Sequence, residues 1–225
     1  HTANGSWSAS QAQFVPRRVL PVYERQIFPE KLLGETNLPD WQTAGTTIAE
    51  TKALRTWTLD DGSEGPSGKR VLIASIKNKM HAISPEVMEG LMEAVEVAES
   101  DFDGMVIWSG DSPFSVGADL EATMPAFVIG GADAIESIEQ ELQNLMLRLR
   151  YAQVPVVSAI HGLALGGGCE MAVYSARRVA HMESYIGLVE VGVGLVPGAG
   201  GLTYIARRAA ENAATSTGKD LLPFL

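Results

Sequence analysis

Two glutamates stand in apolar, glycine-rich surroundings. Glu170 follows the triple glycine at 166–168 and Cys169, and Glu190 lies twenty residues later inside the apolar stretch 186–191. Burying a carboxylate costs free energy unless it has a partner or a role. Two carboxylates in one low-dielectric pocket repel each other, so one of them can hold a proton near neutral pH. Such a pair can act together as general acid and general base.

A simpler interpretation stays open for each acid taken alone. Glu170 could stabilise the N-terminus of a helix through the helix dipole, and Glu190 could be a surface residue at a sheet edge. The residue types and their spacing do not decide between these roles and catalysis.

The triple glycine indicates a close backbone approach. Segment 163–170 follows an expected strand and is expected to open a helix. Successive glycines let another group come near the backbone, and amides at a helix N-terminus favour negative charge. An oxyanion hole needs donors of this kind. A tight turn needs the same glycines, so glycine content alone leaves both interpretations open.

Several common motifs are absent from the sequence. Neither glycine-rich stretch ends in Gly-Lys-Ser or Gly-Lys-Thr, so no phosphate-binding P-loop is predicted. Pro197 stands where the dinucleotide-binding fingerprint over 192–197 needs glycine or alanine. No Gly-x-Ser-x-Gly elbow occurs, and no Cys/His cluster has the spacing of metal ligands.

The elements that must position these residues alternate between strands and helices. Short apolar runs rich in β-branched residues predict strands at 70–76, 104–108, 154–160 and 177–182. Ser84 followed by Pro85 predicts a helix start, with the helix running to about residue 100, and a 3.6-residue apolar period predicts a longer helix at 132–151. The alternation predicts an α/β fold with a largely parallel sheet.

The N-terminal third has a different pattern. Residues 14–66 carry scattered apolar residues and many prolines and glycines, which predicts an extended arm with short turns. The run 60–68, rich in Asp, Gly and Ser, is typical of a linker. We therefore expect a tail, arm and linker at 1–68 and the functional core at 69–225.

Composition narrows the function classes. The 225 residues include 17 Lys and Arg against 27 Asp and Glu, a net charge of −10, which weighs against nucleic-acid binding. Cys169 is the single cysteine, so no internal disulfide can form. No apolar run reaches about 18 residues and no signal-peptide pattern is seen, so we expect no membrane association and a cytoplasmic location.

Four segments between residues 70 and 208 resemble the enoyl-CoA hydratase/isomerase (crotonase) superfamily. They are Met-His-Ala-Ile-Ser at 80–84, Phe-Ser-Val-Gly-Ala-Asp-Leu at 114–120, Ala-Leu-Gly-Gly-Gly-Cys-Glu at 164–170, and the glycine-rich segment 190–201. The resemblance implies a ClpP-like spiral of β-β-α units. It also implies that the backbone amides of Ala118 and Gly167 form an oxyanion hole for a thioester oxygen. In this resemblance Glu170 activates water and Glu190 delivers a proton.

The implied ligand is an acyl-CoA. The implied reaction is reversible hydration of a trans-2-enoyl-CoA to a 3-hydroxyacyl-CoA in fatty-acid β-oxidation, with no metal or redox cofactor. The resemblance places substrate contacts at Ala82, Ile83, Asp119, Leu120 and Gly168. Because one fold can host several reactions, an isomerase, another crotonase reaction and a non-catalytic acyl-CoA-binding fragment stay open.

Three features depart from the pattern of a stand-alone hydratase. Val189 stands where relatives usually carry proline before the second glutamate. The chain stops at Leu225, and full-length relatives continue with C-terminal helices that cover the site and build trimers. We therefore expect truncated C-terminal helices here and a trimer-type homo-oligomer in the full-length protein. Segment 19–31 resembles the connection in multifunctional β-oxidation proteins, which implies a preceding hydroxyacyl-CoA dehydrogenase domain in the parent chain.

Overall fold

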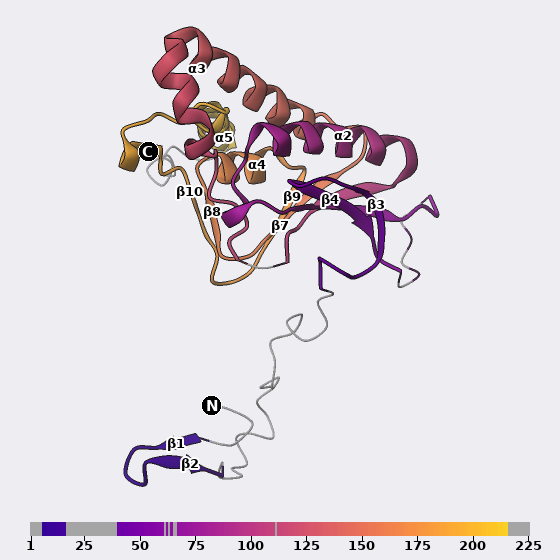
Figure 1. The fold of residues 1–225 in the computed structure, drawn as a ribbon, viewed down its shortest axis with the longest axis vertical. Helices are drawn as coiled ribbons and strands as arrows, with labels where there is room; N and C mark the ends of the chain where they lie inside the picture. The colour runs from indigo at the N-terminus through magenta and orange to yellow at the C-terminus, as the bar shows by residue number, and fades with distance from the viewer. Residues whose placement is uncertain are drawn as a thin grey trace. The chain divides into compact units, whose positions relative to one another are not determined.

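The computed structural model describes residues 6–16, 40–60, 62, 64, 67–110 and 112–215 (Figure 1). The chain divides into two compact units, residues 1–39 and residues 40–225. In the first unit, β1 (Ser6–Ser8) and β2 (Gln13–Val15) form an antiparallel hairpin in which Trp7 faces Phe14, with ring centroids 5.3 Å apart. The expected interdomain connection at 19–31 lies outside the described residues.

A six-stranded sheet is the base of the second unit. Its spatial order is β3 (Thr46–Glu50), β4 (Leu54–Thr58), β5 (Val71–Ile76), β6 (Gly104–Ile107), β7 (Val156–Ile160) and β9 (Arg177–Ala180). The strands β5, β6, β7 and β9 pair in parallel, whereas β3, β4 and β5 pair antiparallel. The predicted largely parallel α/β sheet and its four predicted strands are confirmed. A separate parallel pair joins β8 (Leu163–Leu165) to β10 (Tyr185–Gly187).

Strands β3 and β4 correct the expectation of an extended arm. All five residues of β4 are buried, and Trp57 donates from Nε1 to Ser75 Oγ on β5 at 2.9 Å. The buried Arg55 donates to the carbonyl of Ala44 and to Thr47 Oγ1, both at 2.8 Å. Hydrogen bonds of this kind let β4 bury polar side chains. The strand therefore does not show the continuous apolar run by which the other strands were predicted. The expected boundary at residue 68 stays a prediction about domain organisation, although the sheet itself begins at Thr46.

The described part of the chain contains four helices. They are α2 (Pro85–Asp101), α3 (Leu120–Arg150), α4 (Gly167–Tyr174) and α5 (Gly201–Thr215), with short 3-10 turns η1 (Lys79–His81) and η2 (Glu190–Val193). The predicted start of α2 is confirmed, because the Val87 amide donates to Ser84 Oγ at 3.4 Å. The predicted helix at 132–151 is the second part of α3, which begins twelve residues earlier and is interrupted at Gly131, where φ is 61°.

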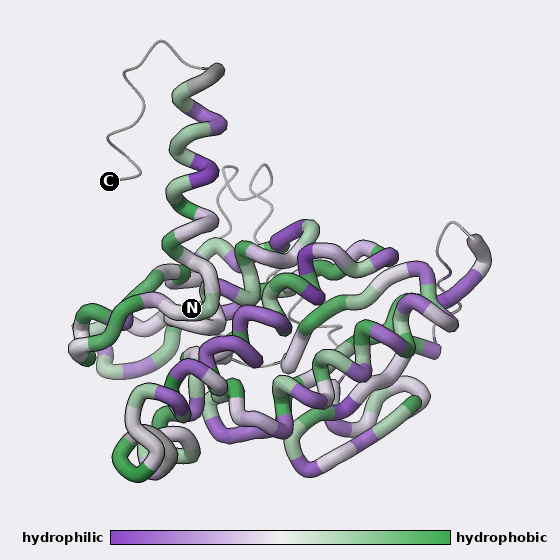
Figure 2. Tube along the Cα trace, turned by 90° about the horizontal axis from the view of Figure 1, so that it is seen from above, coloured by the Kyte–Doolittle hydropathy of each residue, from purple (hydrophilic) through white to green (hydrophobic). Residues whose placement is uncertain are grey.

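The helices cover the sheet in two layers. Helix α2 packs on β4, β5 and β6, α4 packs on β7 and β9, and α3 packs on both of these helices (Figure 1). The apolar stripes meet in one core that includes Leu91 and Val95 of α2 and Leu145, Met146 and Leu149 of α3. Figure 2 shows apolar and polar segments alternating along the helices, and α5 projecting away from the other elements. Among the described residues no helix is both long and apolar enough to cross a bilayer.

One ion pair ties the ends of α2 and α3 together. Arg148 donates from both terminal nitrogens to the two carboxylate oxygens of Glu99 at 2.6 Å, and the Gln153 amide donates to the same carboxylate at 2.8 Å. The Arg148 hydrogen bonds, and after them the Gln153 amide, lower the pKa of Glu99 from 4.5 to about 2. This geometry is bidentate and partly buried, so it contributes more than an ordinary surface pair.

We predict that Glu99→Gln lowers the free energy of unfolding by about 1–2 kcal/mol at pH 7. The pKa of Glu99 is lower in the folded state than its ordinary value of 4.5. The stabilisation is therefore present above about pH 4.5 and is lost as the pH falls toward 2. Urea unfolding at pH 7 and pH 3 measures both effects, with Arg70→Gln, in an exposed pair with Asp60 at 3.8 Å, as the control. Equal losses at the two pH values would contradict the assignment.

Candidate active site

A cavity of about 240 Å³ lies between α3, the N-terminal end of α4 and the η2 segment. Its wall is largely apolar, with Leu120, Ile138 and Leu142 among the lining residues. The predicted pair Glu170 and Glu190 both line it. The tertiary structure therefore brings together two acids that the sequence separates by twenty residues.

Glu170 is buried at the start of α4, with 1% of its surface exposed. Its Oε1 accepts a hydrogen bond from the Gly201 amide at 2.7 Å. Burial is the main cause that raises the pKa of Glu170 from 4.5 to about 7. The Gly201 amide opposes the rise, and the charges of Glu190 and Glu139 contribute to it. Near neutral pH this carboxyl is therefore divided between its acid and base forms, which general acid–base chemistry requires.

Glu190 opens η2 and faces the triple glycine. A Cβ placed on Gly166 would lie 3.4 Å from Glu190 Oε1, so the carboxylate rests against the glycine backbone. Its Oε2 is buried and has no hydrogen-bond partner among the described residues. Such an orphaned acceptor has an unmet demand for a donor, which a protonated substrate group or water would supply.

Val189 stands where relatives usually carry proline, and its backbone φ angle is not one that proline adopts. It lies at φ −122° and lines the cavity just before Glu190. A proline ring would hold φ near −65°, about 55° away. The residue therefore sets a local turn that proline could not form without moving the acid.

A third carboxylate, Glu139 of α3, also lines the cavity and was missed by the sequence analysis. Its side chain contacts Gly198, and its Oε2 is buried without a partner among the described residues. Burial raises the pKa of Glu139, and the charge of Glu190 raises it further. A signal was present, because Glu139 follows Ile135 by four residues and precedes Leu142 by three, which puts it on the apolar stripe of the predicted helix.

Two backbone amides face the same cavity. Ala118 and Gly167 both line it, and a Cβ placed on Gly167 would lie 3.5 Å from the Ala118 nitrogen. Neither amide donates a hydrogen bond to any other residue in the part of the chain that the structure describes. Gly117 makes this juxtaposition sterically feasible, because its φ is 92° and a Cβ there would lie 2.9 Å from the Gly167 nitrogen. Paired open donors of this kind can hold an oxyanion.

Of the residues implied as substrate contacts, only Leu120 lines the cavity. The buried Ile83 packs beside Gly167, and its amide donates to the Gly117 carbonyl at 2.8 Å. The Asp119 carboxylate caps α3 by accepting from the Ala122 amide at 3.0 Å.

Ala82 and Gly168 do not line the cavity. The Ala82 carbonyl accepts from Asn78 Nδ2 at 3.2 Å, and Gly168 packs against the Ser115 backbone. Their substrate contacts stay predictions. No three His, Cys, Asp or Glu side chains among the described residues are placed to hold a metal ion.

We predict that Glu170→Gln stabilises the protein at alkaline pH. Because the folded-state pKa of about 7 lies above the ordinary 4.5, the stabilising contribution of the protonated acid is present below about pH 4.5 and is lost as the pH rises through 7. Well above pH 7 the buried charge costs roughly 3 kcal/mol, which glutamine would avoid while still accepting from Gly201. Urea unfolding at pH 5 and pH 8 measures this gain.

The exposed Glu141 of α3 provides the control, because Glu141→Gln should change the unfolding free energy by less than about 0.5 kcal/mol at either pH. If the gain from Glu170→Gln were the same at pH 5 and pH 8, the carboxylate charge would not be its cause.

Relatives of known name share this core. A Rickettsia felis protein named as a fatty acid oxidation complex trifunctional enzyme is 41% identical over 128 residues, covering 57% of this chain and 18% of that protein. The peroxisomal bifunctional enzyme of Cavia porcellus is 38% identical over 130 residues, covering 57% of this chain and 17% of that enzyme. The matched region is thus about a fifth of the length of these relatives.

Solved structures confirm the predicted crotonase-type fold. Pseudomonas aeruginosa DspI superposes with a TM-score of 0.55 at 26% identity, covering 61% of this chain and 56% of that chain. An enoyl-CoA hydratase from Thermoplasma volcanium superposes with a TM-score of 0.56 at 25% identity, covering 64% of this chain and 58% of that chain. The family model for enoyl-CoA hydratase/isomerase matches residues 69–218, which is more than half of the chain. The chain therefore belongs to the enoyl-CoA hydratase/isomerase family.

Proposed function

We propose that this chain catalyses the reversible hydration of a trans-2-enoyl-CoA to a 3-hydroxyacyl-CoA. The observation that carries the proposal is the convergence of Glu170, Glu190 and the open amides of Ala118 and Gly167 on one largely apolar cavity. Hydration of a conjugated thioester needs these three functions: a base for water, an acid for carbon, and donors for the thioester oxygen.

The two amides would bind the thioester oxygen. In the transition state the π electrons of the C2–C3 double bond move toward the thioester, and negative charge develops on that oxygen. The amides of Ala118 and Gly167 would stabilise this charge, and Gly167 is the first residue of α4, where the helix dipole favours an anion.

The two acids would divide the proton transfers. Glu170 takes a proton from water while the water oxygen bonds to C3, and Glu190 gives a proton to C2. Proton exchange with solvent then resets both acids, and the reverse sequence dehydrates the product. Burial and the charge of Glu190 raise the pKa of Glu139, the third carboxyl group of this cavity.

The names of the relatives support a place in fatty-acid oxidation. The curated relatives are a trifunctional and a bifunctional enzyme, of which this chain matches about a fifth. We infer that the chain is the hydratase part of such a multifunctional protein, in which a dehydrogenase domain precedes it. The trimer-type assembly, the cytoplasmic location and the independence from metal and redox cofactors stay predictions.

We predict that Glu170→Gln and Glu190→Gln each lower the hydration rate of crotonyl-CoA at least about 100-fold, because each removes a group that transfers a proton. Loss of absorbance of the conjugated thioester measures the rate. Glu141→Gln, on the exposed side of α3, should keep the parent rate. Formation of the conjugated thioester from a 3-enoyl-CoA, with no hydration, would instead indicate an isomerase.

We predict that Gly117→Ala lowers the same rate without removing either acid. A Cβ at Gly117 would lie 2.7 Å from the Leu165 carbonyl and 2.9 Å from the Gly167 nitrogen, so the two donors must move apart. Loss of one oxyanion donor typically costs about 100-fold in rate. Gly62→Ala is the matched control, since Gly62 also has a positive φ, 75°, but no atom within 4 Å of a Cβ there. Equal rates for the two variants would refute the assigned donors.

A further inference from the structure

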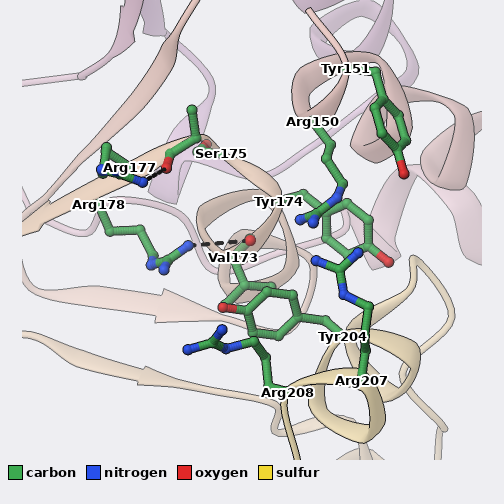
Figure 3. A pocket seen from close by; sticks show the side chains of 11 residues that line it. Arg150, Tyr151, Val173, Tyr174, Ser175, Arg177, Arg178, Tyr204, Arg207 and Arg208 are labelled. Atoms are coloured by element: carbon green, nitrogen blue, oxygen red, sulfur yellow. Dashed lines mark hydrogen bonds between the residues drawn. The ribbon is translucent and has the colours of Figure 1, made fainter. Parts of the chain in front are cut away.

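Five arginines converge on a second cavity of about 430 Å³, a volume within the usual range of small-molecule sites. The arginines are Arg150 at the end of α3, Arg177 and Arg178 at the start of β9, and Arg207 and Arg208 on α5 (Figure 3). This cavity shares no lining residue with the candidate active site. Among its described lining residues none is acidic, although the whole chain carries a net charge of −10.

One carboxylate offsets a small part of this charge. Glu211 pairs with Arg207 at 3.2 Å and with Arg208 at 2.8 Å on the surface of α5. The other three arginines have no carboxylate partner among the described residues. One negative charge beside five guanidinium groups leaves a strongly positive cavity on an acidic protein.

Aromatic rings hold part of the cluster in place. The Arg150 guanidinium lies 5.9 Å from the ring centroids of both Tyr151 and Tyr174, and the Tyr174 and Tyr204 rings are 6.2 Å apart. In Figure 3 the Arg150 and Arg207 side chains point from opposite sides toward Tyr174. A guanidinium held over a ring face keeps its N–H edge available, so these donors are oriented before any ligand arrives.

Favourable interactions with helix C-termini explain the positions of only some of these arginines. Arg150 lies in the last turn of α3, and Arg178 donates to the Val173 carbonyl near the end of α4 at 3.3 Å, as cations at helix C-termini do. Arg177 begins a strand and donates to the Ala176 carbonyl, just past the end of α4, at 3.1 Å. Arg207 lies inside α5 and has no such role. Gathering all of these positive charges around one cavity costs free energy through repulsion, which an anion in the cavity would remove.

We propose that this cavity binds a small anion with two or more linked phosphate groups. A guanidinium group can donate two parallel hydrogen bonds to two phosphate oxygens. The arginines here come from α3, β9 and α5, so together they can bind a ligand with several negative charges better than they can bind a single carboxylate. The recognised chemistry is the phosphoanhydride chain, whether free or part of a nucleotide. The proposal does not rest on the hydratase activity, because the two cavities share no lining residue.

Titration calorimetry of the 225-residue chain with inorganic tripolyphosphate tests the proposal. We expect one binding site whose affinity falls as salt rises. Arg150→Gln and Arg177→Gln should each weaken binding about 10-fold or more, the effect of losing a charge-assisted hydrogen bond. Arg150→Lys should also weaken it, because lysine keeps the charge and loses the fork. Arg70→Gln, which changes an exposed arginine outside the cavity, should stay within about twofold of the parent.

Two further arms separate the alternatives. Citrate, a tricarboxylate, should bind at least about tenfold more weakly than tripolyphosphate, since a carboxylate array lacks the linked phosphate geometry. Tighter binding of ATP than of tripolyphosphate would show a nucleotide ligand, and equal binding would show that the phosphate chain is sufficient; both support the proposal. Glu170→Gln should bind tripolyphosphate as the parent does. Thermal unfolding of every variant confirms that it is folded.

Absence of binding, equal affinity of folded arginine variants and parent, or citrate bound as tightly as tripolyphosphate would overturn the proposal. Failure of the hydratase assay would leave these results unchanged, because no residue of the second cavity lines the first.

Discussion

The close approach of segments 115–118 and 163–168 is the constraint on which the site depends. The Ser115 amide donates to the Leu163 carbonyl at 3.0 Å, and the Leu165 amide donates back to the Ser115 carbonyl at 2.9 Å. Gly117 and Gly168 have no side chain to separate the two backbones. This contact fixes the start of α4, and with it both the open amides and the first residues of the helix that carries Glu170.

The position of α4 buries the carboxyl group of Glu170, and burial disfavours its charged form. The Gly201 amide, at the start of α5, satisfies one oxygen of Glu170, and the Gly200 carbonyl next to it accepts a hydrogen bond from Tyr174 at 3.0 Å. The turn between the glycine-rich segment and α5 is thus fixed from both ends of α4. Burial of the Glu170 carboxyl group costs free energy, and the hydrogen bonds of this turn together with the apolar core packed by α3 and α4 offset that cost.

The same turn lies between two cavities of opposite character. One is lined by three carboxylates in a largely apolar wall, and the other by arginines and tyrosines. Tyr174 belongs to the second cavity and holds the turn that hydrogen-bonds Glu170. Each cavity forms where elements distant in the chain meet.

The sequence alone determined the parallel strands, the start of α2 and the family, because these depend on local periodicity, capping and ordered motifs. It singled out Glu170 and Glu190 as a pair only through the family resemblance, and the tertiary structure brought them to one cavity. The sequence did not reveal β3 and β4, whose polar residues are satisfied by distant partners such as Ser75 on β5. Nor did it reveal Glu139 in the cavity or the arginine cluster. Only the tertiary structure decided these, because helix packing and chain crossings set which distant side chains share one volume, and no local pattern encodes that distance.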